Sequence, residues 1–190
     1  MKRTATNTPP LSVRHVAIGS DHGGFDLKAK LIPLLQSRGL AVADLGTHSA
    51  EPCDYPAIGY KVAIAVSEGR FDRGILLCKS GIGIAIVANK VPSVRAAVCS
   101  DVFDAERCRS HNDANILVLG AEKLNETKAR RIVDTWLATS FEAGGRHERR
   151  VHQIAAIERK LVRAQQSTIS HQRSGSGRKR VGANQRSAER

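Results

Sequence analysis

The sequence predicts an α/β protein built on a parallel sheet of about five strands. Short runs of Val, Ile and Leu alternate along the chain with segments of helical periodicity. Glycines follow several of these apolar runs, at the points where a strand would turn into the next helix. Strands that alternate with helices run parallel, and the connecting helices cover the two faces of the sheet. We therefore expect a doubly wound, Rossmann-like sheet flanked by helices, with an additional C-terminal helix.

The expected elements follow one another in regular alternation. The strands are expected at residues 16–19, 41–45, 74–78, 94–99 and 115–119. The helices are expected at residues 25–38, 57–68, 84–90, 101–110, 125–139 and 151–164. In the first helix, Leu27, Leu31 and Leu34 recur at intervals of three or four and form an apolar stripe. Gly39 is suited to end it, because glycine readily adopts the left-handed conformation that often follows a helix.

Composition divides the 190 residues into one domain with two extensions. Residues 1–14 are polar and contain two prolines, so we expect a disordered leader. Residues 15–164 are expected to form the folded domain. Residues 165–190 contain six Arg or Lys against one Glu and few apolar side chains, which predicts a basic, disordered tail.

Several classes of protein are disfavoured by composition. Aromatic residues make up 4% of the chain, too few for a surface that stacks bases, so nucleic acid is not an expected partner despite the net charge of +12. The four cysteines, Cys53, Cys78, Cys99 and Cys108, show no Cys-x-x-Cys spacing, so we expect reduced thiols and no cysteine-based metal site. The chain has no apolar leader and no long apolar run, which predicts a cytoplasmic protein without a membrane span.

The most informative stretch is 74–90, which reads as a strand, a glycine turn and the start of a helix. Backbone N–H groups in such a turn lack helical partners and would stabilise a thiolate at Cys78 or a bound anion. A cysteine at a strand end can equally be a packing residue. Gly81 and Gly83 could also be half of a dinucleotide fingerprint, but Ile86 occupies the position of the third glycine.

Other polar groups follow predicted strands and should meet this turn. In a doubly wound sheet, ligands bind beyond the carboxyl ends of the strands, where the strand order reverses. Asp21 and His22 follow the first strand, and Ser100 and Asp101 follow the fourth, so all could line one crevice with Cys78. The alternatives are that Asp21 caps the next helix and that His22 merely opens a loop.

Two further groups would suit a phosphorylated substrate. Arg146 and Arg150 are four residues apart, so both would lie on one helix face, where guanidinium groups could bind a phosphate or simply face solvent. His111 precedes Asn112 and could act in proton transfer or be a polar residue at a helix end. A thiolate base, a histidine, a carboxylate and backbone amides together could move a proton between adjacent carbons.

Five ordered motifs resemble those of one family. They are Ser20-Asp21-His22-Gly23-Gly24; Asp54-Tyr55-Pro56; Cys78-Lys79-Ser80-Gly81-Ile82-Gly83 with Ala88-Asn89-Lys90; Arg109 to Asn115; and Gly144-Gly145-Arg146-His147. Over residues 15–160 the chain resembles the LacAB/RpiB sugar-phosphate isomerases, of the ribose-5-phosphate isomerase B type. The resemblance implies an aldose-ketose isomerase of the pentose phosphate pathway that interconverts ribose 5-phosphate and ribulose 5-phosphate through a cis-enediolate, without metal or other cofactor.

The resemblance also implies a role for each site residue. Cys78 matches the catalytic base, and Ser80 with the amides of Gly81 and Gly83 would stabilise the enediolate. His111 matches the residue that opens the sugar ring, with Asp21 as a proton shuttle. The substrate-binding positions are matched by His22, Tyr55, Asn112, Arg146 and Arg150. The family site is shared across a homodimer, and the sequence leaves open whether dimers pair into tetramers.

Three positions depart from the family pattern. Lys79 replaces a common glycine and could contact substrate, Glu122 stands where many members have a phosphate-binding arginine, and Ala57 replaces a frequent polar residue. These departures keep two alternatives open. One is the same chemistry on another phosphosugar, a tetrulose or hexose phosphate. The other is a non-catalytic sugar-phosphate sensor whose basic tail binds a polyanion.

Overall fold

The computed structural model describes residues 13–178, with side chains up to residue 168. The leader prediction falls mostly, and the tail prediction partly, on residues outside this range. The chain divides into two compact units, residues 1–148 and 149–190. The first unit ends inside the segment 15–164 that we assign to one domain, so these domain boundaries stay a prediction.

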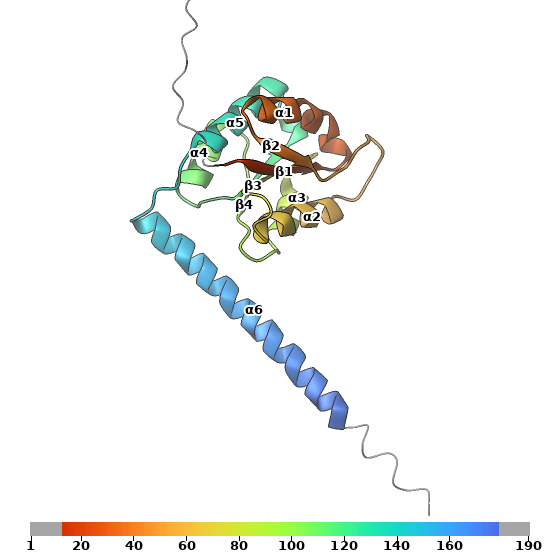
Figure 1. Cartoon of the computed structure of the whole chain (residues 1–190), viewed down its shortest axis with the longest axis vertical. Coiled ribbons are helices and arrows are strands. Elements are labelled where there is room, and N and C mark those ends of the chain that lie inside the picture. Colours follow the sequence, from red (N-terminus) through yellow and green to blue (C-terminus); the bar gives the residue numbers. More distant parts are fainter. Residues whose placement is uncertain (1–12, 179–190) are drawn as a thin grey trace, which may run out of the picture. The chain divides into compact units, whose positions relative to one another are not determined.

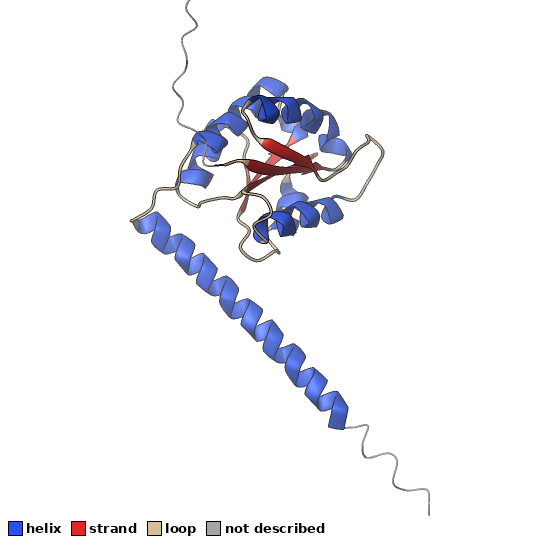
Figure 2. Cartoon of the chain, in the orientation of Figure 1, coloured by secondary structure: helices blue, strands red, loops and turns tan. Residues whose placement is uncertain are grey.

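A five-stranded, all-parallel sheet forms the centre of the first unit (Figures 1 and 2). Its strands are β1 (His15–Ser20), β2 (Ala41–Asp44), β3 (Arg73–Cys78), β4 (Ala96–Val98) and β5 (Ile116–Gly120). They lie in the order β2-β1-β3-β5-β4. The central strand, β3, is buried from Gly74 to Cys78, as expected for a parallel strand covered on both faces. This arrangement confirms the predicted fold class.

Helices cover both faces of the sheet (Figure 2). They are α1 (Phe25–Ser37), α2 (Tyr55–Ser67), α3 (Ile82–Ala88), α4 (Val102–Ser110) and α5 (Glu126–Ala138), with the short 3₁₀ turns η1 (His22–Gly24) and η2 (Ala121–Lys123). Apolar side chains of α1, α4 and α5 pack in one core cluster around Trp136, and those of α2 and α3 pack in a second around Val62. Gly39 follows α1 with φ of +79°, as expected at a helix end.

Two elements differ most in length from the sequence-based expectation. Strand β4 spans only Ala96–Val98, because it is the edge strand and pairs with β5 alone. Helix α6 spans Arg146–Arg178, so it begins before residue 151 and continues beyond residue 164. Its early start has a local cause: Gly144 adopts φ of +85°, and its amide donates to the Glu148 carboxylate at 2.8 Å. Within residues 13–178, no helix is apolar over a length that would cross a bilayer.

The strand order places a switch point between β1 and β3. The chain moves from β1 outward to β2, then returns across β1 to β3 and continues to the other side of the sheet. The helices after β1 and β3 therefore leave on opposite faces and open a crevice at the carboxyl ends of these two strands. Asp21 follows β1 and Cys78 ends β3, so the topology brings them to the same place.

Candidate active site

Cys78 is the last residue of β3, and a tight turn folds over its sulfur. The side chain is buried, with 4% of its surface exposed. The amide of Gly81 donates to Sγ at 3.0 Å. Gly81 can direct its amide there because it adopts φ of +82°, which favours glycine. The turn therefore directs a backbone N–H group at the Cys78 sulfur.

The rest of the turn is held by close contacts. Ser80 Oγ accepts the Ile82 amide at 3.3 Å. The Tyr55 ring lies directly over Gly83, where a Cβ atom would come within 2.6 Å of the ring carbon Cζ. The structure thus brings together the predicted positions Tyr55, Ser80, Gly81 and Gly83 around Cys78.

Asp21 lies on the neighbouring strand end, beside the residue that precedes Cys78. Its amide donates to the Leu77 carbonyl at 3.2 Å. Asp21 is 6% exposed, and its carboxylate accepts a hydrogen bond from the Gly24 amide at 3.1 Å. Asp21 therefore does cap the following turn, and it also lies at the carboxyl edge with Cys78. His22 is exposed, and its Nδ1 accepts the Cys53 amide at 3.2 Å, which fixes the ring against the loop before α2.

Lys79 and Glu122, which both depart from the family pattern, contact each other. Their side chains form an exposed ion pair at 3.3 Å, and the Glu122 amide donates to the Lys79 carbonyl at 3.1 Å. The stem of Lys79 runs past Gly23, where a Cβ atom would lie 3.1 Å from Lys79 Cγ. The cation introduced by one change is therefore balanced by the anion introduced by the other.

His111 lies at the opposite edge of the sheet from Cys78. It follows α4, which starts at the carboxyl end of β4 and runs back toward the amino ends of the strands. The neighbouring Asn112 carbonyl accepts a hydrogen bond from Arg95, which precedes β4, at 3.0 Å. A single chain therefore does not bring His111 and Asn112 to Cys78 and Asp21.

His111 belongs to a cluster of its own at that amino edge. Its ring stacks on the His147 ring with centroids 3.8 Å apart and an angle of 5°. Glu142 Oε2 lies 3.9 Å from Nε2 of each histidine. Arg107 lies 3.0 Å from His111 Nε2, and Arg146 Nε lies 3.3 Å from His147 Nε2. The predicted residues His111 and Arg146 are thus brought together, along with His147 and Glu142.

The three groups His111, Glu142 and His147 have ligand atoms within 4.8 Å of one another, a spacing that could hold a metal. Two observations argue against this use. In parallel stacked rings the nitrogen lone pairs do not converge on one point, and an arginine N–H lies against each Nε2. The cluster is better suited to proton transfer and to binding an anion.

Arg109 is a structural residue that sequence reasoning included in a motif without assigning a role. It is buried, and its guanidinium donates to the Asp113 carboxylate and to the Ala114 carbonyl, both at 2.8 Å. Asp113 in turn adopts φ of +48°. Arg109 therefore fixes the turn that carries His111. The spacing of four residues between Arg109 and Asp113 is the sequence signal for this pair.

Two predicted placements need separate comment. Ser100 and Asp101 follow β4, the edge strand that β5 separates from β3, and the Asp101 carboxylate caps α4 by accepting the Asp104 amide at 2.9 Å. That they share the crevice with Cys78 stays a prediction. Arg150 belongs to the second unit, and its phosphate-binding role stays a prediction.

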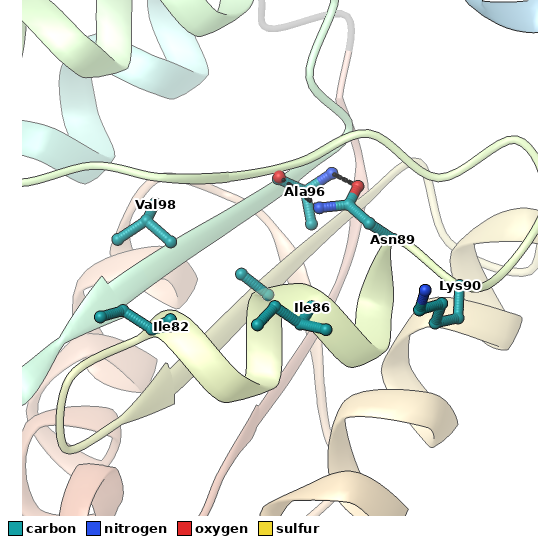
Figure 3. Close-up of a pocket in the computed structure, with 7 residues that line it drawn as sticks. Ile82, Ile86, Asn89, Lys90, Ala96 and Val98 are labelled. Carbon is teal, nitrogen blue, oxygen red and sulfur yellow. Dashed lines mark hydrogen bonds between the residues drawn. The ribbon is translucent and has the colours of Figure 1, made fainter.

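An apolar groove lies between α3 and β4 (Figure 3). Ile82 and Ile86 project from the helix toward Val98 on the strand, and all three side chains are exposed. Asn89 closes one end by exchanging two hydrogen bonds of 2.9 Å with the backbone of Ala96. We call this surface, with its exposed isoleucines next to the Cys78 turn, the α3 face.

Comparison with known proteins agrees with this architecture. Residues 16–154 match the Ribose/Galactose Isomerase family. Ribose-5-phosphate isomerase B of Escherichia coli (strain K12) is 45% identical over 78% of this chain and 99% of its own. D-erythrulose-4-phosphate isomerase of Pectobacterium atrosepticum is 42% identical over 68% of this chain and 86% of its own. The solved structure of Clostridium thermocellum ribose-5-phosphate isomerase B has 52% identity and a TM-score of 0.75, and the match covers 77% of this chain and 99% of that one.

The parallel sheet, the cysteine at its switch point and these relatives define an enzyme of the aldose-ketose isomerase class that acts on a phosphorylated sugar. Within that class, the chain belongs to the Ribose/Galactose Isomerase family.

Proposed function

We propose that this enzyme interconverts ribose 5-phosphate and ribulose 5-phosphate, with Cys78 as the base. The observation that carries the proposal is the 3.0 Å hydrogen bond from the Gly81 amide to Cys78 Sγ, at the switch point of the sheet. In its thiolate form, Cys78 would accept a proton from a substrate carbon, and the resulting thiol would return it to the next carbon. The Escherichia coli and Clostridium thermocellum relatives, 45% and 52% identical to this chain, are both named ribose-5-phosphate isomerase B.

Each group would have a defined task in this reaction. His111 would open the furanose ring by proton transfer to the ring oxygen, with Asp21 as the proton shuttle. Cys78 would take the proton from C2 of the open aldose and deliver it to C1, which yields the ketose. The negative charge that develops on the substrate oxygens would be stabilised by Ser80 and by the amides of Gly81 and Gly83. His22, Arg146 and Arg150 would bind the phosphate, while Tyr55, Lys79 and Asn112 would orient the sugar.

The purified enzyme should convert ribose 5-phosphate to ribulose 5-phosphate without added metal or nucleotide. The measurement is absorbance of the ketose, followed by mass spectrometry of product formed in deuterium oxide. A cis-enediolate whose proton passes through Cys78 should leave deuterium on the reacting carbon whenever the thiol exchanges with solvent. Absence of ketose formation at millimolar substrate would rule out this sugar.

A tetrulose phosphate is the second candidate substrate. The specific support is the Pectobacterium relative named for D-erythrulose 4-phosphate, together with the Lys79–Glu122 pair, which changes the charge pattern beside the site. Comparing kcat/KM over four-, five- and six-carbon phosphosugars distinguishes the candidates. A higher value for a four- or six-carbon sugar would replace ribose 5-phosphate in the proposal and leave the chemistry unchanged.

We also propose that the working enzyme is a homodimer with shared sites. In one chain Cys78 and His111 lie at opposite edges of the sheet, so the reaction as written needs the His111 cluster of a second copy. The exposed α3 face adjoins the Cys78 turn and offers apolar surface for this contact. In a two-fold dimer each chain gives its thiol to one site and its histidine to the other.

Mixing two inactive variants tests this arrangement. Cys78→Ala and His111→Asn chains should each be inactive alone. If sites are shared, co-refolded chains form mixed dimers in which one of two sites has both residues intact, so activity should return to about a quarter of the wild-type value. If each chain carried a complete site, mixed dimers would stay as inactive as their parents.

A further inference from the structure

We propose that Cys99 and Cys108 form a reversible disulfide when hydrogen peroxide reaches them, and that this bond slows the isomerase. Their sulfur atoms lie 3.6 Å apart, although the proposed reaction uses neither. Cys99 follows β4, and Cys108 lies in the last turns of α4. The slowing of the isomerase rests on the proposed function, whereas formation of the disulfide does not.

The two thiols are already in contact inside the protein. Cys99 is 1% exposed and Cys108 is 9% exposed, and both belong to the core cluster around Trp136. A disulfide requires a separation of about 2.05 Å, so the sulfur atoms must approach each other by roughly 1.5 Å. Only nine positions separate the two residues, so the covalent link closes a short loop within one strand–helix unit.

The surroundings distinguish the roles of the two sulfurs. The pKa of Cys108 is lowered, first by the hydrogen bond that the two sulfur atoms share and also by the positive charge of Arg109. The pKa of Cys99 is raised by the same hydrogen bond and by burial. Cys108 is also the more exposed of the two. The lower pKa and the greater exposure of Cys108 both favour it as the sulfur that reacts first with an oxidant.

The chemistry balances with peroxide as the only oxidant. The Cys108 thiolate attacks one peroxide oxygen, the O–O bond breaks, and sulfenic acid and hydroxide form. The Cys99 sulfur then attacks the Cys108 sulfur, the S–O bond breaks, and water leaves with the Cys99 proton. Two sulfurs are each oxidised by one electron, and the two peroxide oxygens end as water and hydroxide. A small thiol such as dithiothreitol reverses the bond by exchange.

Closure of this bond would act on His111 through the backbone. The Cys108 carbonyl accepts the Ala114 amide at 2.9 Å, and the next residue is Arg109, which fixes the turn through Asp113. Drawing Cys108 toward β4 therefore shifts the segment 108–114 that carries His111. Displacement of a reacting group by about 1 Å can cost a hundredfold in rate. We expect oxidation to lower turnover by at least about tenfold.

The test oxidises the full chain with hydrogen peroxide, alkylates the remaining thiols with N-ethylmaleimide and digests with trypsin. Cleavage after Arg95, Arg107 and Arg109 should yield peptide 96–107 joined to the dipeptide 108–109. Dithiothreitol should separate the two and restore activity. This mass-spectrometric readout is independent of which sugar the enzyme isomerises.

Cys99→Ser provides the matched control, because it keeps Cys108 and Cys78 in place. The variant should show no linked peptide. It should also lose less activity to peroxide than the wild type, because oxidation of Cys78 can occur in both proteins but the disulfide can form only in the wild type. Cys108→Ser should behave in the same way. Absence of the linked peptide, at peroxide doses that oxidise Cys108 to higher acids, would overturn the disulfide. Equal loss of activity in wild type and Cys99→Ser would overturn its effect on turnover.

Discussion

Replacing Cys78 with alanine is expected to lower kcat by between about a hundredfold and ten-thousandfold, the range that a single general acid–base group contributes. The alanine side chain cannot accept a proton, and no other ionisable side chain occupies the end of β3 in its place. The fold should persist, because the change removes one sulfur atom from a well-packed cluster and, with it, a single hydrogen bond from the Gly81 amide. The measurement is kcat for ribose 5-phosphate, with circular dichroism to verify the fold.

Cys53→Ala is the matched control for this experiment. Cys53 is half-buried in the loop before α2 and contributes its backbone amide, not its thiol, to the contact with His22. Its turnover should therefore stay within about twofold of the wild-type rate, since surface substitutions seldom alter an enzyme strongly. A Cys78→Ala enzyme with wild-type kcat would refute the assignment of the base.

Gly120→Ala is expected to damage both stability and activity. Gly120 ends β5 opposite Cys78, and a Cβ atom there would lie 2.6 Å from the Ser80 carbonyl oxygen and 2.9 Å from the Ser80 carbonyl carbon. These are backbone atoms that cannot rotate away, so the Ser80–Gly83 turn must move. We expect a loss of about 1–3 kcal/mol in the free energy of unfolding and a fall of about a hundredfold in kcat/KM.

Urea unfolding and steady-state kinetics measure the two effects. Gly145→Ala is the control for stability, because a Cβ atom at Gly145 meets no atom within 4 Å and its φ is not positive. That variant should unfold at the same urea concentration as the wild type. A Gly120→Ala enzyme with unchanged kcat/KM would show that the Cys78 turn tolerates displacement, against the close packing described above.

The sheet could be predicted from sequence because each of its strands has a local signal, a short apolar run bounded by polar or turn residues. The apolar run 74–78 and the glycine turn after it have no good alternative to a buried strand and a reversal. Asp21 and Cys78 could be placed together for the same reason, since parallel strands end at a common edge. Strand order could not be predicted, because it depends on long-range packing, so the sequence did not show that β5 lies between β3 and the edge strand β4.

The contacts of individual side chains could not be predicted from local sequence patterns. Lys79 and Glu122 each depart unfavourably from the family pattern when considered alone. They form an ion pair because β3 and β5 are neighbours and end side by side. The contact between Cys99 and Cys108 likewise requires the path of α4 across the sheet. Helix α6 continued past residue 164 because Ala164, Gln165 and Gln166 favour helix without burying a face. Sequence composition alone does not separate such a helix from coil.

The distance between Cys78 and His111 has a consequence for the newly made polypeptide. With the thiol at one edge of the sheet and the imidazole at the other, the proposed shared site implies that a newly synthesised chain would carry half of each of two sites. Turnover would begin only after a second chain binds, so the rate per molecule would fall on extreme dilution.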